Sequence, residues 1–412
     1  MRIVLVSHSD KRGGAAVVTY RLMEALARQG VEVSMLVSEK LSDDPRVHLL
    51  GSSLGRKGRF LSERLNIFTH NGFSRRDLFK VSVATRGYDI ASYPIAREAD
   101  AIIISWINQG TLSLGDIRRR GRLNRPIAWM MHDMWTMTGI CHHAHDCAAY
   151  GATCGSCPYI HLPWSHTSDL STTCQLRKRA TYDAVPQLRF VAVSSWLAEC
   201  AARSSLLRDR MVVTIPNPFP IADFHTRPRE RKTEKRIIVM GAARLDDPIK
   251  GLPTAVAALN VLGGMRPDLA EDTEAVFFGG LRDVHALDAL EFPHRYLGRI
   301  DDPTELRELY ARGSVVLSTS EFETLPGTII EGMAAGCTPV CFDRGGQRDI
   351  IEDGVSGHFA RYGDPESVAG QIAQALDHPF DRERQHDRIA RLFGADTIAR
   401  RYIELLAPES EG

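Results

Sequence analysis

The sequence lacks the features that place a protein in a membrane or on a nucleic acid. Its apolar runs, including the one after Met1, are much shorter than the roughly 20 residues of a transmembrane helix. We therefore expect neither a membrane span nor a signal peptide. Lys and Arg together number 51, as do Asp and Glu, so the chain has no overall positive field for a polyanion. We expect a cytoplasmic protein with no nucleic-acid partner.

The sequence does contain enough apolar residues for two folded domains. It has 412 residues, of which 43% are hydrophobic and 25% are charged. A single hydrophobic core rarely serves more than about 250–300 residues, so a chain of this length is expected to divide. Two domains imply a cleft between them, and such clefts are common places for ligands.

Short aliphatic runs alternate with helical patterns twice along the chain, which is typical of parallel sheets with helices on both faces. The predicted strands are 2–6, 31–37, 101–105, 127–131, 190–193, 237–240, 275–278, 315–318 and 338–342. The polar, charged run 227–236 resembles a linker. We therefore predict an α/β fold with two doubly wound parallel-sheet domains, 1–225 and 226–395. The final segment, 396–412, is expected to be helical, and packing on either domain, the N-terminal one included, stays open.

A Pro-Gly pair interrupts the chain between the strand at 315–318 and the helical pattern that follows it. Leu325, Pro326, Gly327 and Thr328 form this turn, and the Thr328 hydroxyl is expected to cap the helix. The N–H groups at the start of a helix have no partner within it and attract anions, phosphate among them. The turn is therefore a candidate phosphate site.

Two glutamates and two cations accompany this turn. Glu331 is expected in the first turn of the helix, where its carboxylate can accept hydrogen bonds from ribose hydroxyls, and Glu323 is expected at the strand end. Arg244 and Lys250 follow the strand at 237–240, and a planar guanidinium with an ammonium can clamp a diphosphate. Each residue alone would more often be a solvated charge or a partner of a helix dipole. Only the set predicts a nucleotide site.

The N-terminal half has two further candidate positions. Gly13 and Gly14 stand between a strand and a helix, where glycine lets the backbone approach a ligand closely or simply makes a turn. His132 and Asp133 follow the predicted strand at 127–131, at the sheet edge where α/β proteins bind ligands. We favour a functional role for His132 over that of a core histidine.

These residues resemble the retaining GT-B glycosyltransferases of family 4, and more closely a subgroup that assembles bacterial exopolysaccharides of the colanic-acid type. In that family an arginine and a lysine hold the donor diphosphate, and two glutamates separated by seven residues contact the donor sugar and the ribose. Arg244, Lys250, Glu323 and Glu331 match those places. The resemblance runs along nearly the whole chain. The family's last glycine-rich loop often ends in a glutamate, where this chain has Asp349.

The resemblance implies two Rossmann-like domains facing a central cleft, and transfer of a hexose from a nucleoside-diphosphate sugar with retention of configuration. Gly13 and Gly14 would border the donor phosphate, and His132 would contact the transferred sugar or the acceptor. The chain contains no Asp-x-Asp pair, so we expect Arg244 and Lys250, rather than a metal ion, to stabilise the leaving diphosphate. The expected acceptor is a glycan or a lipid-linked glycan, with peripheral inner-membrane contact through the basic region 56–76 as one hypothesis.

Two other functions use the same site features. A sugar-nucleotide epimerase would also hold a diphosphate and a ribose but would need no acceptor. A non-catalytic nucleotide-sugar binding module would bind without turnover. Neither the donor base, the sugar nor the acceptor can be read from these motifs, because a fold does not determine them.

The segment 139–160 is the second unusual feature of the sequence, because it concentrates four cysteines and three histidines. Cys154 and Cys157 form a Cys-x-x-Cys turn, and Cys141 and Cys147 would complete a four-thiolate shell for a structural zinc ion. The alternatives are reduced thiols packed as small apolar groups, a redox pair or an iron–sulfur cluster.

Overall fold

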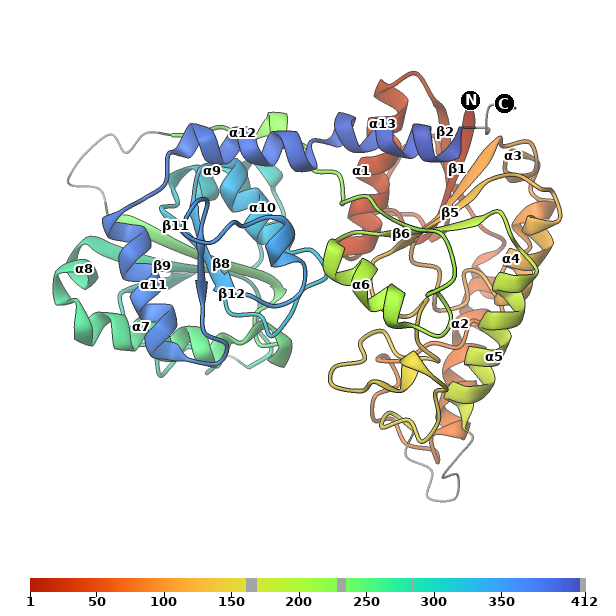
Figure 1. The fold of residues 1–412 in the computed structure, drawn as a ribbon, viewed down its shortest axis with the longest axis horizontal. Coiled ribbons are helices and arrows are strands. Elements are labelled where there is room, and N and C mark those ends of the chain that lie inside the picture. Colours follow the sequence, from red (N-terminus) through yellow and green to blue (C-terminus); the bar gives the residue numbers. More distant parts are fainter. Residues whose placement is uncertain (161–168, 228–234, 284, 408–412) are drawn as a thin grey trace. The chain divides into compact units, whose positions relative to one another are not determined.

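The computed structural model describes residues 1–160, 169–227, 235–283 and 285–407 (Figure 1). The chain forms two compact units. Unit 1 comprises Met1–Pro218 and Ile398–Gly412, and unit 2 comprises Phe219–Thr397. In the described ranges no helix combines the length and the apolar character that crossing a bilayer requires.

Unit 1 contains a parallel sheet whose strand order is β3-β2-β1-β4-β5-β6-β7. The strands are β1 (Arg2–Ser9), β2 (Glu32–Glu39), β3 (Val47–Leu49), β4 (Ala101–Ile104), β5 (Ile127–Met131), β6 (Leu188–Ala192) and β7 (Val212–Thr214). The helices between them include α1 (Gly14–Arg28), α2 (Ser53–His70), α3 (Pro94–Arg97), α4 (Leu114–Gly121), α5 (Leu170–Asp183) and α6 (Ser195–Arg203). Every residue of β4 and β5 is buried, as expected for central strands covered on both faces.

Unit 2 repeats this architecture with the strand order β10-β9-β8-β11-β12-β13, again parallel. The strands are β8 (Arg236–Arg244), β9 (Thr273–Gly280), β10 (His294–Tyr296), β11 (Val315–Ser318), β12 (Thr338–Phe342) and β13 (His358–Ala360). The helices include α7 (Leu252–Met265), α8 (Pro267–Asp272), α9 (Pro303–Arg312), α10 (Gly327–Ala334), α11 (Pro365–Asp377) and α12 (Arg382–Phe393). Helices α7 and α11 cover one face of the sheet, and α9, α10 and α12 cover the other (Figure 1). The two sheets confirm the predicted α/β fold.

The last helix, α13 (Ala395–Leu406), begins in unit 2 and enters unit 1 at Ile398. Its buried residues recur at helical spacing, and Tyr402 is fully buried. Arg401 donates a hydrogen bond to the Thr214 carbonyl, at the end of β7. The chain therefore returns to unit 1 through a packed helix. The C-terminal segment thus shares a unit with the N-terminal half of the chain, and unit 2 starts at Phe219, before the boundary at 225 that composition suggested.

Candidate active site

The carboxyl ends of β8 and β11 bring Lys250 and Glu323 into contact. These strands are neighbours in the sheet, so the loops that follow them emerge side by side. The Lys250 Nζ and Glu323 Oε1 atoms are 2.5 Å apart, and the Ser320 hydroxyl donates to the same carboxylate oxygen at 3.0 Å. Both side chains are partly exposed, at 26% and 22%. The predicted cation and the predicted sugar-binding glutamate therefore form one ion pair.

Gly251 determines the path of the chain after Lys250. Its φ of 65° lies in the left-handed region, and a Cβ at this position would stand 2.0 Å from the Thr319 carbonyl oxygen. The Thr319 hydroxyl in turn donates to the Gly251 carbonyl at 2.9 Å. Glycine is required here because both the backbone conformation and the close approach exclude a side chain. This contact holds the loop that contains Lys250 against the end of β11.

Arg244, the last residue of β8, is held by acidic neighbours in its own loop. One guanidinium nitrogen lies 2.7 Å from Asp247, and Nε lies 3.6 Å from Asp246. The side chain remains one-third exposed. An arriving diphosphate would therefore compete with Asp247 for Arg244 and with Glu323 for Lys250.

The turn at Leu325–Thr328 differs from its prediction in one respect. Helix α10 starts at Gly327, its N-cap is Pro326, and no side chain of the described residues caps it. Thr328 is the second residue of the helix, so the prediction that it caps the helix is wrong. Proline at this position has no side-chain acceptor, and so it leaves the first N–H groups without a side-chain cap. Leu325 is buried and anchors the turn.

Glu331 is the fifth residue of α10 and lies in the second turn, so its predicted place in the first turn is also wrong. Its carboxylate lies close enough to Tyr310 to help burial raise the pKa of that phenol. The other glutamate is fixed through its backbone, because the Gly346 N–H donates to the Glu323 carbonyl at 2.8 Å. Gly345 allows this contact with a φ of 84°. The last glycine-rich loop therefore supports the strand end that presents Glu323.

In unit 1, Gly13 and Gly14 stand at the start of α1 with open space around them. Gly13 is the N-cap with a φ of 90°, which favours glycine. A Cβ at either position would meet no atom within 4 Å. The requirement for glycine at Gly13 is thus conformational, and the surface above both residues is unobstructed.

His132 follows β5, as predicted, and its ring is fixed by buried hydroxyls. Its Nε2 lies 2.8 Å from the Ser105 oxygen, which lies 2.6 Å from the Thr19 oxygen. Burial lowers the pKa of His132 to about 4, although Asp133 acts in the opposite direction. His132 is therefore neutral at physiological pH and can either donate or accept a hydrogen bond.

Asp133 belongs to a network that the sequence patterns do not reveal. His142 Nδ1 lies 2.7 Å from its Oδ2, the Trp106 indole donates to it at 3.2 Å, and the Trp135 N–H donates at 2.8 Å. Burial alone would raise the pKa of Asp133, but His142 and the Trp135 N–H lower it to about 2. Spacing in the sequence groups His142 with the cysteines, whereas its side chain contacts Asp133.

The cysteine segment lies around one cavity of about 400 Å³ that Cys141, Cys147, Cys154 and Cys157 all line. All eight cysteines of the chain are free. Burial raises the pKa of Cys141 to about 11 and that of Cys157 to about 12, so these thiols are protonated. In the described ranges no three His, Cys, Asp or Glu side chains converge as metal ligands do. The geometry thus gives no support to a zinc ion, and the zinc site stays a prediction from spacing.

Comparison with known proteins gives a family match over part of unit 2. Residues 234–378 match the family described as glycosyl transferases group 1. The phosphatidyl-myo-inositol mannosyltransferase of Mycolicibacterium smegmatis is 28% identical over 174 residues, which make up 40% of this chain and 43% of that protein. The match thus spans less than half the length of that relative.

Solved structures extend the likeness to the whole chain at the level of fold. Sucrose-phosphate synthase from Thermosynechococcus elongatus has a TM-score of 0.64 at 16% identity, over 98% of both chains. Anabaena HepE in complex with UDP has a TM-score of 0.60 at 17% identity, over 98% of this chain and 99% of that one. This chain therefore has the α/β fold of the GT-B glycosyltransferases, and its residues 234–378 carry the sequence signature of glycosyl transferases group 1.

Proposed function

We propose that this protein is a retaining, metal-independent glycosyltransferase that moves a hexose from a nucleoside-diphosphate sugar to a glycan or lipid-linked glycan. The observation that carries the proposal is the contact between Lys250 and Glu323, beside an uncapped helix start. These groups lie within the segment that matches glycosyl transferases group 1. HepE, a protein of the same fold, is known in complex with UDP, which supports a nucleotide ligand.

The proposed chemistry depends on charge that develops on the leaving diphosphate. Arg244 and Lys250 exchange their carboxylate partners for phosphate oxygens, and the N–H groups at the start of α10 provide further donors. As the bond between the anomeric carbon and the diphosphate oxygen breaks, the electron pair moves to that oxygen. The acceptor hydroxyl then attacks from the same face and gives its proton to the diphosphate.

The remaining residues bind and orient the substrates in this proposal. Glu323 contacts the donor sugar once Lys250 has turned to the phosphates, and Glu331 accepts hydrogen bonds from the ribose. Gly13 and Gly14 border the phosphates, and neutral His132 contacts the transferred sugar or the acceptor. His142 and Trp106 hold Asp133 in place beside it.

We also propose that the chain acts in the synthesis of a cell-surface polysaccharide and touches the inner membrane through α2. Leu54, Leu61 and Leu65 recur on one side of this helix and are 80%, 62% and 60% exposed. Arg56 and Lys57 add positive charge to the helix. Apolar side chains together with cations are the features of helices that lie in a membrane interface.

A thermal-shift panel of UDP, GDP, ADP and dTDP in EDTA tests the donor site. A ligand that binds only the folded protein raises the apparent melting temperature, so one of the four should stabilise the wild type. Arg244→Ala should abolish that shift. Arg299→Ala is the matched control, because Arg299 is 73% exposed and pairs with the exposed Asp301. If no nucleotide shifts the wild type, or Arg244→Ala responds as the wild type does, the proposed site is wrong.

A further inference from the structure

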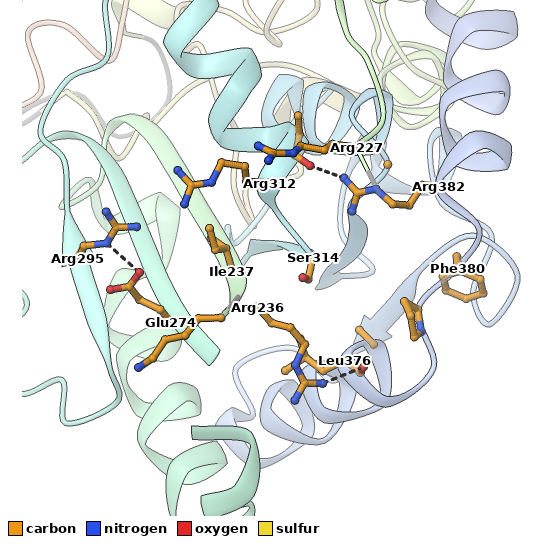
Figure 2. Close-up of a pocket in the computed structure, with 15 residues that line it drawn as sticks. Arg227, Arg236, Ile237, Glu274, Arg295, Arg312, Ser314, Leu376, Phe380 and Arg382 are labelled. Atoms are coloured by element: carbon orange, nitrogen blue, oxygen red, sulfur yellow. Dashed lines mark hydrogen bonds and ion pairs between the residues drawn. The ribbon is translucent and has the colours of Figure 1, made fainter. Parts of the chain in front are cut away.

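Unit 2 has a second group of cations at the amino ends of its strands. Lys250, in contrast, follows the carboxyl end of β8. A cavity of about 410 Å³ opens at the amino ends of the strands, beside Arg236 at the start of β8 and Ser314 just before β11 (Figure 2). Six cationic side chains line this cavity, together with a single carboxylate, that of Glu274. The cations are Arg227, Lys235, Arg236, Arg295, Arg312 and Arg382. We call this cavity the amino-edge pocket.

Three of these cations are held in place by neighbours, which gives the pocket a fixed shape. Arg382 donates to the Ala311, Gly313 and Ala335 carbonyls, at the ends of α9 and α10, at 2.7–2.8 Å. Arg295 pairs with Glu274 at 2.8 Å. Arg236 pairs with Asp272 at 3.0 Å and donates to the Leu376 carbonyl. Figure 2 shows the Arg295–Glu274 and Arg236–Leu376 contacts on either side of Ile237.

The pocket still has donors that the protein does not use. Among the described residues, the buried Nε atoms of Arg236 and Arg382 have no hydrogen-bond acceptor. In the described part of the chain the side chains of Arg312 and Lys235 have no hydrogen bond or ion pair. A bound anion would give the two buried Nε donors an acceptor and the exposed cations Arg312 and Lys235 a counter-ion.

From these observations we infer that the amino-edge pocket binds a small soluble molecule that carries two or more phosphate groups. Guanidinium forks match pairs of phosphate oxygens, and several such cations select for more than one phosphate. Ile237, Leu376 and Phe380 add an apolar lining that suits a carbon skeleton between the phosphates. The volume is within the usual range of small-molecule sites.

This site is separate from the proposed donor site. Arg236 and Arg244 are the first and last residues of β8, and a nine-residue strand places them roughly 26 Å apart. One diphosphate cannot reach both ends of the strand. A ligand in the amino-edge pocket can therefore bind together with a nucleotide sugar.

The test uses the full chain with the substitutions Arg244→Ala and Lys250→Ala, which disable the donor site. Calorimetry in EDTA then measures the binding of inorganic tripolyphosphate to this donor-disabled protein. One tripolyphosphate per chain should still bind. Adding Arg312→Gln and Lys235→Gln should weaken that binding at least tenfold, whereas adding Arg299→Gln instead should leave it unchanged. Loss of binding in the donor-disabled protein, or equal binding with and without Arg312→Gln and Lys235→Gln, would overturn the inference.

Two further measurements separate this site from a general effect of charge. Tripolyphosphate should raise the melting temperature of the donor-disabled protein, because it binds only the folded state, and adding Arg312→Gln and Lys235→Gln should abolish that rise. Sedimentation with phosphatidylcholine vesicles containing one-fifth phosphatidylserine should not depend on Arg312. If sedimentation is lost with Arg312→Gln, the pocket binds a lipid headgroup and the small-ligand assignment is wrong.

Discussion

At the residue scale, we expect the ion pair between Lys250 and Glu323 to couple nucleotide binding to the proposed reaction. Glu323→Gln removes a negative charge that faces the proposed diphosphate and frees Lys250 from its partner. We predict that nucleoside diphosphate binds about fivefold more tightly, from roughly 1 kcal/mol of relieved repulsion. Turnover should nevertheless fall by about two orders of magnitude, because the amide cannot replace the carboxylate beside the reacting sugar. Calorimetry and a release assay measure the two effects, and weaker nucleotide binding would contradict the charge argument.

His132 makes the stability of unit 1 depend on pH. Its folded pKa of about 4 lies below the ordinary value of 6.5, so between these values the unfolded chain binds more protons than the native one. Stability should therefore fall as pH decreases from 7 to 4.5, by about 2 kcal/mol from this group. His132→Gln should lose that part of the pH dependence.

Tryptophan fluorescence during urea unfolding measures this effect, because the sequence of unit 2 contains no tryptophan and the described tryptophans, Trp106, Trp129, Trp135 and Trp196, lie in unit 1. The informative quantity is the difference in unfolding free energy between wild type and His132→Gln at each pH. If that difference is the same at pH 7 and pH 4.5, His132 is not held neutral by burial.

At the scale of elements, the loop between β8 and α7 depends on a single glycine. Gly251→Ala forces a side chain into the left-handed region and against the Thr319 carbonyl, so we predict a loss of at least about 2 kcal/mol in the stability of unit 2. Gly264→Ala is the matched control, because a Cβ at this position in α7 would meet no atom within 4 Å and should stabilise the helix by about 0.5 kcal/mol. Urea unfolding followed by circular dichroism compares the two, and equal effects would contradict this role.

Sequence patterns predict the central strands well and the short elements poorly. Strands such as β5 are continuous apolar runs, and burial on both faces produces that pattern directly. The three-residue strands β3, β7, β10 and β13 escape prediction, because three residues are too few to show a period. The predicted start of α10 is too late in the chain. Threonine is a common N-cap residue and proline is not, so the sequence favours Thr328 over Pro326 as the N-cap.

Sequence patterns also predict only part of the candidate site. Lys250 and Glu323 could be found because each follows a strand, and the strand ends of a parallel sheet meet at one edge. The contacts of Asp133 with His142 and Trp106 could not be found in this way, because Trp106 belongs to the loop after β4 and His142 lies further along the irregular segment after β5. The amino-edge pocket has no sequence signature, since its cations come from strand starts and helix ends spread over residues 227–382.

At the scale of the whole molecule, the last helix ties the end of the chain to unit 1. Tyr402 is fully buried, and its hydroxyl has no hydrogen-bond partner among the residues that the structure describes. Tyr402→Ala should therefore cost about 3–5 kcal/mol in unit 1, whereas Tyr402→Phe should be neutral or slightly stabilising. Tryptophan fluorescence reports the unfolding of unit 1. A Tyr402→Ala protein as stable as the wild type would show that α13 does not hold unit 1 together.

The measurement that tests the central claim most directly is the release of nucleoside diphosphate from its sugar in EDTA, with water taking the sugar in place of the acceptor hydroxyl, by wild type and Lys250→Ala. The donor is the one whose nucleotide stabilises the wild type in the thermal-shift panel. We predict that the wild type releases the nucleotide without metal, and that Lys250→Ala does so at least about 100-fold more slowly. Nucleotide affinity should fall by only about tenfold. Equal rates in the two proteins, or a wild type that releases none, would contradict the account.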